Sequence, residues 1–154
     1  MRGLVVTLLL LSAAAGSAAA QSIGLPLPAG KQFAQNPNLP PGGEFVVLAG
    51  MPNAAGPYAF RVRFAPGLRV LPHSHPDDRL YTVLAGRWTI GIGTAFDSTK
   101  LVTLGAGEVY VLPANTVHFH MGLEGGAMFQ VSGIGPTATT YLRPEDDPRQ
   151  VRRN

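Results

Sequence analysis

Short β-type runs separated by turn residues fill the chain beyond Gly43 and constrain its fold more than any other feature. Strands are predicted at residues 44–48, 60–64, 68–71, 79–84, 88–92, 101–104, 108–112, 117–121 and 127–131. Glycine-containing turns are predicted at residues 65–67, 85–86, 105–107 and 124–126. No long segment repeats its apolar residues with the helical period. These patterns predict an all-β fold, closed as a barrel or layered as two sheets, because both arrangements dispose of open strand edges.

Alternation within the runs predicts which side chains point inward. Phe60, Val62 and Phe64 alternate with Arg61 and Arg63. Successive side chains of a strand point to opposite faces, so the apolar set is expected in the core and the guanidinium groups in water. A later run repeats the pattern with Trp88, Ile90 and Ile92.

The beginning of the chain has the pattern of a secretory signal peptide. Met1-Arg2 is positively charged, Leu4 to Ala15 is apolar, and Ala18-Ala19-Ala20 is typical of a cleavage site. The apolar run is shorter than a membrane-spanning helix requires. We therefore expect cleavage after Ala20, a secreted or periplasmic protein, and no membrane anchor.

The mature chain divides into an arm, a barrel and a tail. Residues 21–43 are rich in proline and glycine, which excludes a helix or a central strand and predicts an extended arm. The sequence leaves open whether this arm is disordered, crosses the barrel or reaches a partner subunit. Residues 44–142 are expected to form a single β-barrel, and residues 143–154 a charged, exposed tail.

Composition excludes several classes of function. The chain has no cysteine, which rules out disulfides, thiolate metal ligands and a catalytic thiol. Its formal net charge is only +3, and the arginines are dispersed rather than gathered in a stripe. Nucleic-acid binding is therefore not supported.

The four histidines of the chain form two pairs with one residue between the partners, His73-Ser74-His75 and His118-Phe119-His120. Residues i and i+2 of a strand point to the same face, so each pair presents two imidazoles side by side. Neutral imidazole is a common metal ligand. We predict that two strands, facing each other across a barrel interior, bring the pairs together as a site for one divalent ion of iron, manganese, nickel or zinc.

The surroundings of these pairs resemble the cupin family, whose first motif reads G-x5-H-x-H-x3,4-E-x6-G and whose second reads G-x5-P-x-G-x2-H-x3-N. The positions that match are Gly67, His73, His75 and Gly86 in the first motif, and Gly107, Pro113 and His118 in the second. The resemblance covers residues 67–122. It implies a double-stranded β-helix, or jelly-roll barrel, in which these histidines meet at a metal, and it is compatible with a homodimer.

The sequence departs from the two motifs at Asn115, Gly122 and Arg79. Asn115 replaces a glycine, which is tolerable because asparagine adopts left-handed conformations more readily than other non-glycine residues. Gly122 replaces an asparagine. Arg79 replaces the glutamate that would be a metal ligand, and arginine offers only donors and stays protonated.

A guanidinium about 6 Å from a divalent ion, at an effective dielectric near 20, opposes metal binding by on the order of 5 kcal/mol. Three arrangements relieve this repulsion. Asp77 or Asp78 could neutralise Arg79, His120 could complete an all-imidazole ligand set, or an anionic substrate could bridge Arg79 and the metal. A metal-free pocket, with Arg79 in a structural salt bridge, is the remaining alternative.

The leading hypothesis is a metal-dependent enzyme of the oxygenase, isomerase or lyase type that acts on a small anionic or carbonyl-containing molecule. His120 is a candidate fourth ligand or general base, Arg79 a candidate anion clamp, and Tyr81 a candidate donor to the substrate. The competing hypothesis is a non-catalytic module that binds a small ligand or a metal. The glycine pairs Gly91-Ile92-Gly93 and Gly133-Ile134-Gly135 lack the strand-to-helix setting of a phosphate loop and are discounted.

Overall fold

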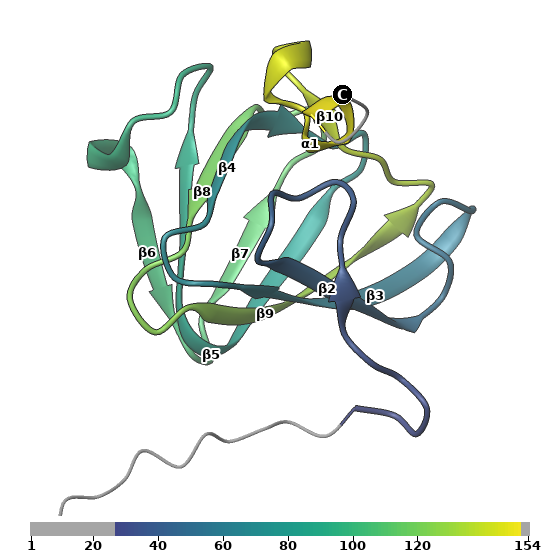
Figure 1. The fold of residues 1–154 in the computed structure, drawn as a ribbon. Coiled ribbons are helices and arrows are strands. Elements are labelled where there is room, and N and C mark those ends of the chain that lie inside the picture. Colours follow the sequence, from purple (N-terminus) through teal and green to yellow (C-terminus); the bar gives the residue numbers. More distant parts are fainter. Residues whose placement is uncertain (1–26, 152–154) are drawn as a thin grey trace, which may run out of the picture.

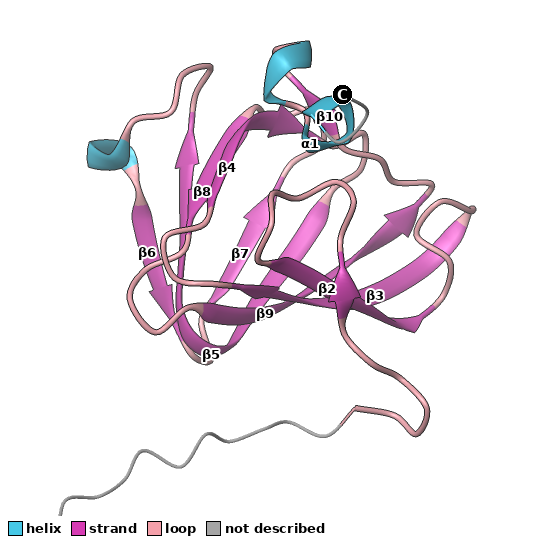
Figure 2. Ribbon diagram, in the orientation of Figure 1, coloured by secondary structure: helices cyan, strands magenta, loops and turns pink. Residues whose placement is uncertain are grey.

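A computed structural model describes residues 27–151 of the chain. Its strands are β1 (Ala34–Gln35), β2 (Gly43–Ala49), β3 (Gly56–Phe64), β4 (Arg69–Ser74), β5 (Arg79–Ile92), β6 (Val102–Gly105), β7 (Val109–Leu112), β8 (His118–Met121), β9 (Ala127–Gly135) and β10 (Thr140–Tyr141). They curve around a common interior (Figure 1). Within residues 27–151, helical structure is limited to short segments at the periphery, namely 3-10 turns at Ser98–Lys100 and Pro144–Asp146 and helix α1 at Pro148–Val151 (Figure 2). The all-β fold predicted from the sequence is confirmed.

Strand order explains how the barrel closes. The hydrogen-bonded order is β1-β2-β3-β9-β5-β8-β4-β10, and β6 and β7 both pair with β5. All of these pairings are antiparallel. The first half of β5 lies between β9 and β7, whereas its last residues pair with β8. One long strand therefore links the two faces of the barrel.

The turn predicted at Ala85-Gly86 is wrong. These residues lie inside β5, where the register with β9 shifts between Val83 and Ala85 and Gly86 has a φ of 69°. A β-bulge accounts for both observations, since it accommodates an extra residue and bends the strand without ending it. Glycine at positive φ is as typical of a bulge as of a turn, so the local sequence does not separate them.

The core lies between the curved sheets and follows the predicted alternation, with one exception. Phe60, Val62 and Phe64 are buried, as are Trp88 and Ile90. Ile92 was expected to point inward but is 46% exposed. It is the last residue of β5 and pairs with His118 on β8, so its exposed side chain lies at the end of the strand.

The arm lies against the barrel over its described residues. β1 pairs with β2, Leu39 is buried in the core, and the Tyr141 hydroxyl donates to the backbone oxygen of Asn38 at 2.8 Å. The predicted signal peptide, residues 1–20, lies outside the described part of the chain. Within the described part, no helix is long and apolar enough to cross a membrane.

Candidate metal centre

The two histidine pairs lie on neighbouring strands. His73 is on β4 and His75 follows its last residue, while His118 and His120 are both on β8. β4 and β8 are hydrogen-bonded antiparallel partners, with His73 opposite His118. The prediction that two strands bring the pairs together is confirmed, but the strands lie side by side rather than across the barrel. Long-range strand pairing decided this detail, and the local sequence does not encode it.

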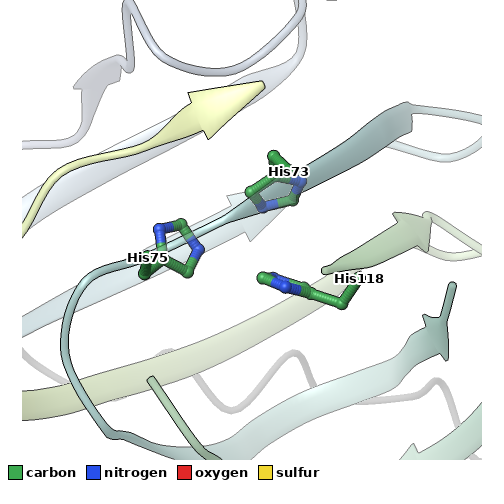
Figure 3. Close-up of side chains that lie close together, drawn as sticks. All are labelled: His73, His75 and His118. Carbon is green, nitrogen blue, oxygen red and sulfur yellow. The ribbon is translucent and has the colours of Figure 1, made fainter. Parts of the chain in front are cut away.

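Three of the imidazoles converge on one point. Ligand nitrogens of His73, His75 and His118 all lie within 4.8 Å of one another. Their ring centroids are 4.2 Å apart for His73 and His118, and 5.0 Å apart for each of the other two pairs. Figure 3 shows the three rings around a shared space. This arrangement suits a divalent ion held on one side by three nitrogens.

Backbone carbonyls set the orientation of these rings. The Nδ1 atoms of His73, His75 and His118 lie 2.8, 2.8 and 2.9 Å from the carbonyl oxygens of Leu71, Ala138 and Thr116. A carbonyl only accepts, so each Nδ1 carries the proton and donates, which leaves the Nε2 lone pair for the site. Hydrogen bonds from the far ring nitrogen to a backbone carbonyl orient metal-binding histidines in this way.

One buried nitrogen of the cluster has no hydrogen-bond partner within the protein. His118 Nε2 is fully buried and unpaired among the described residues. A buried polar atom without a partner costs about 1–3 kcal/mol, so such atoms are rare. A metal ion bound to His118 Nε2 would supply the missing partner. The three histidines therefore fit a metal site.

The histidines are neutral near pH 7. Burial lowers the pKa of His73 and His75 well below 6.5, and Arg79 and the neighbouring imidazoles lower them further. Burial also lowers the pKa of His118 to about 4, and that of His120 well below 6.5. Neutral imidazole is the form that binds a metal.

His120 is next to the cluster but outside the group whose nitrogens lie within 4.8 Å. Its ring centroid is 4.9 Å from that of His118 and 5.2 Å from that of Trp88. Its Nδ1 lies 3.1 Å from the carbonyl oxygen of Thr89. Its role as fourth ligand or general base stays a prediction.

Arg79 is neutralised by a buried carboxylate, the first of the three arrangements foreseen. Arg79 Nε lies 3.5 Å from Asp77 Oδ1, and both side chains are 6% exposed. Arg79 Nη2 donates to Thr137 Oγ1 at 2.5 Å. Asp77 also accepts hydrogen bonds from the hydroxyls of Tyr58 and Thr137. Asp78, the other candidate, is exposed and accepts from the backbone nitrogen of Ala114.

Sequence reasoning missed Tyr58 and Thr137. Tyr58 continues the inward alternation of Phe60 along β3, so its burial was readable in the sequence. Thr137 lies in the loop after β9, where no periodicity points to its partner. Gly133 was set aside as part of a non-functional glycine pair, but a Cβ there would lie 2.6 Å from the Tyr58 hydroxyl and 2.9 Å from Asp77 Oδ2. Its missing side chain makes room for this network.

A cavity of about 330 Å³ adjoins the histidines. His73, His75, His120, Arg79 and Tyr81 line it, together with apolar side chains of β2, β3 and β9 and with residues of the arm and of the loops after β2 and β9. Tyr81 stacks on Trp88 with ring centroids 4.7 Å apart, and burial raises its pKa. The predicted inward orientation of Arg79 and Tyr81 is confirmed.

A curved antiparallel barrel that holds a buried histidine cluster beside an internal cavity defines a class of small barrel proteins with a candidate metal centre. Comparisons with known proteins place the chain within it. The model of the Cupin domain family matches residues 60–130, and this match supports membership of the chain in the cupin superfamily.

Individual similarities agree with this family. The chain is 34% identical over 87 residues to Germin-like protein 1-1 of Oryza sativa subsp. japonica, a match that covers 56% of this chain and 36% of that protein. The chain thus matches only about a third of the length of this curated relative. It is also similar in structure to the polyketide cyclase RemF of Streptomyces resistomycificus, with a TM-score of 0.63, 17% identity and coverage of 81% and 89% of the two chains.

A Bacillus subtilis oxalate decarboxylase with Mn(II) centres is similar with a TM-score of 0.56 and 18% identity, over 73% of this chain and 30% of that one. At such identities the two structural similarities establish the fold, a cupin jelly-roll barrel. The second-motif position Asn115 has a φ of 61°, so its predicted left-handed conformation is confirmed.

Proposed function

We propose that this protein binds one divalent transition-metal ion through His73, His75 and His118, and that it uses the ion to act on a small anionic or carbonyl-containing molecule. Two observations on His118 carry the proposal: its Nε2 is buried and unpaired among the described residues, and one of its ring nitrogens lies within 4.8 Å of ligand nitrogens of the other two. Three ligands on one side leave coordination positions open, as catalytic sites do. The adjoining cavity supports an enzyme over a closed storage site.

Bound there, the ion would supply Lewis-acid polarisation of a substrate oxygen. The residues around the cavity have separate roles in the proposal. Arg79 would orient an anionic or carbonyl oxygen, and Tyr81 would donate a hydrogen bond to it. His120, neutral through burial, would act as fourth ligand or as general base. The Asp77 carboxylate would hold Arg79 in place and offset its charge.

The reaction type is proposed as oxygenase, isomerase or lyase. A polyketide cyclase and an oxalate decarboxylase among the structural relatives support small-molecule chemistry in a barrel of this kind. Fold by itself does not select the reaction.

Metal analysis of protein purified without an affinity tag tests the metal site. We expect about one transition-metal ion per chain and its loss in His75→Ala and His118→Ala. Ser74→Ala is the matched control, because this half-buried residue lies between His73 and His75 in the chain and points to the other face of the strand. A wild-type chain that stays metal-free after incubation with iron, manganese, nickel and zinc salts would reject the proposal.

Turnover tests the enzymatic part. Metal-loaded protein is assayed for oxygen consumption and product formation with enolised diketones, flavonols and small keto acids, with His118→Ala as the inactive control. Turnover by the wild type alone would support the enzyme. Saturable binding without turnover across the panel would instead favour a non-catalytic module.

We also propose that the protein is exported, on the pattern of residues 1–20. Intact mass measured on protein from the periplasm or medium of a bacterial host is expected to correspond to a chain that begins at Gln21. Retention of the full-length mass in the cytoplasm would contradict this.

A further inference from the structure

Part of the cavity wall is built from aromatic rings and valines. Phe45 and Phe60 meet edge to face with centroids 6.5 Å apart, and Phe64 and Phe129 do so at 5.0 Å. All four rings line the cavity, together with Val47 and other aliphatic side chains. Binding is stabilised when apolar atoms of a ligand cover such a surface, by about 25 cal/mol per Å² of apolar surface removed from water.

The polar part of the cavity has almost no net charge of its own. Among the described residues that line it, Arg79 is the only one with an ionised side chain, and Asp77 compensates that charge from behind. The histidines are neutral because burial lowers their pKa values. Attraction for an anion therefore depends on the ion bound by His73, His75 and His118, whose charge would be left undiminished by three neutral ligands.

We propose that the cavity selects an amphiphilic acid, a small molecule with an apolar, ring-bearing body against the phenylalanine wall and one carboxylate or enolate group at the histidine end. This inference names the substrate class and rests on the metal-binding function proposed above. Compact hydrophilic acids leave the apolar wall uncovered and are weak ligands. Neutral amphiphiles cover the wall but gain nothing from the charge of the ion.

The two parts of such a ligand respond differently to removal of the metal. The preference for an apolar body comes from Phe45, Phe60, Phe64 and Phe129 and persists without the ion. The preference for an acid over its amide comes from the charge of the ion and disappears with it. This separation makes the inference testable independently of turnover.

The test measures binding of 3-phenylpropanoate, propanoate and 3-phenylpropanamide to manganese-loaded and chelator-treated protein. Titration calorimetry gives the affinities, and the fluorescence of Trp88, the single tryptophan, reports on the cavity because Trp88 stacks on the lining residue Tyr81. We expect 3-phenylpropanoate to bind at least about tenfold more tightly than propanoate in both forms of the protein. We expect it to bind more tightly than the amide only in the manganese-loaded form.

A matched pair of variants locates the binding surface. Val47 is half-buried and lines the cavity, whereas Val109 on β7 is 52% exposed on the outside. Val47→Asn is expected to weaken both phenyl ligands about fivefold and to leave propanoate unchanged. Val109→Asn is expected to change none of the three affinities. Circular dichroism and metal content confirm that both variants fold and load.

Equal affinity for 3-phenylpropanoate and propanoate would overturn the inference. An equal loss of affinity for the phenyl ligands in Val47→Asn and Val109→Asn would overturn it as well. An acid preference that survives chelation would overturn the part assigned to the ion. A chain that takes up no metal but keeps the phenyl preference would reject the proposed metal function and support the apolar selection.

Discussion

Asp77 reconciles an arginine at position 79 with the proposed metal site. The carboxylate lies 3.5 Å from the guanidinium nitrogen Nε and accepts hydrogen bonds from Tyr58 and Thr137. A buried ion pair contributes little net stability, but removal of one partner leaves an uncompensated buried charge. Its effect at this site is electrostatic, because it offsets the repulsion between Arg79 and a divalent ion.

Asp77→Asn is expected to weaken metal binding by about tenfold or more and to lower the free energy of unfolding by about 3–5 kcal/mol. The double variant Asp77→Asn/Arg79→Met should recover much of both losses, because it removes the two charges together. Competitive metal titration and urea unfolding measure the effects. Asp78→Asn is the control, since it removes the same charge from an exposed neighbour. Wild-type metal affinity in Asp77→Asn would show that the pair does not act on the site.

The histidine cluster predicts acid sensitivity of the metal-free protein. Burial lowers the pKa of His118 from 6.5 to about 4 and those of the other three well below 6.5. Below pH 6.5 the unfolded chain then binds more protons than the folded chain. The contribution of the neutral histidines to the free energy of unfolding is therefore fully present above that pH and is lost as the pH falls. Each histidine contributes up to about 1.4 kcal/mol per pH unit. Urea unfolding at a series of pH values measures this dependence. A free energy of unfolding that does not change between about pH 4 and pH 6.5 would contradict it.

Glycine has packing functions on the strands that form the site. Gly91 on β5 pairs with Phe119 on β8, and a Cβ at Gly91 would lie 2.3 Å from Phe119 Cε2. Gly133 on β9 similarly leaves room for Tyr58 and Asp77. Both belong to glycine pairs that the sequence left without a role. Each lets an aromatic ring from another element approach a strand closely.

Gly91→Ala is therefore expected to lower the free energy of unfolding by about 1–3 kcal/mol, because the Phe119 ring is fully buried and has little space to move. Gly105→Ala on β6 is the matched control, since its added Cβ would meet only Glu108 Oε2 at 3.6 Å. Thermal and urea unfolding of the two variants give the comparison. Equal stability of both would mean that Phe119 is free to shift.

The long strand β5 shows how far strand prediction from the sequence extends. The sequence predicted two separate strands here, one from Arg79 and one that contains Trp88 and Ile90. Apart from Ile92, the side chains predicted to point inward from these two segments are buried. Their continuity through Gly86 was not predicted, because a bulge and a turn use the same residue types. The exposure of Ile92 at the end of β5 depends on which other elements pack there, which is a tertiary property.

For the whole molecule, the proposed ion would link metal binding to stability. Its ligands come from β4, from the residue after it and from β8, so a bound ion ties together segments more than forty residues apart in the chain. A ligand present at about 100 times its dissociation constant stabilises the folded state by about 2.7 kcal/mol. The melting temperature should therefore rise with metal and fall after chelation. His75→Ala should abolish the difference, and a metal-induced shift of wild-type size in that variant would place the ion elsewhere.

The sequence alone determined the all-β class, the inward alternation, the left-handed Asn115 and the presence of four imidazoles on the inner faces of two segments. These properties depend on side-chain period and on backbone preferences of single residues, which act locally. Only the tertiary structure decided that β4 and β8 are neighbours, that Asp77 pairs with Arg79 and accepts hydrogen bonds from Tyr58 and Thr137, and that a cavity adjoins the histidines. Each of these needs contacts between residues distant in the chain, and no local period records which distant segments will meet.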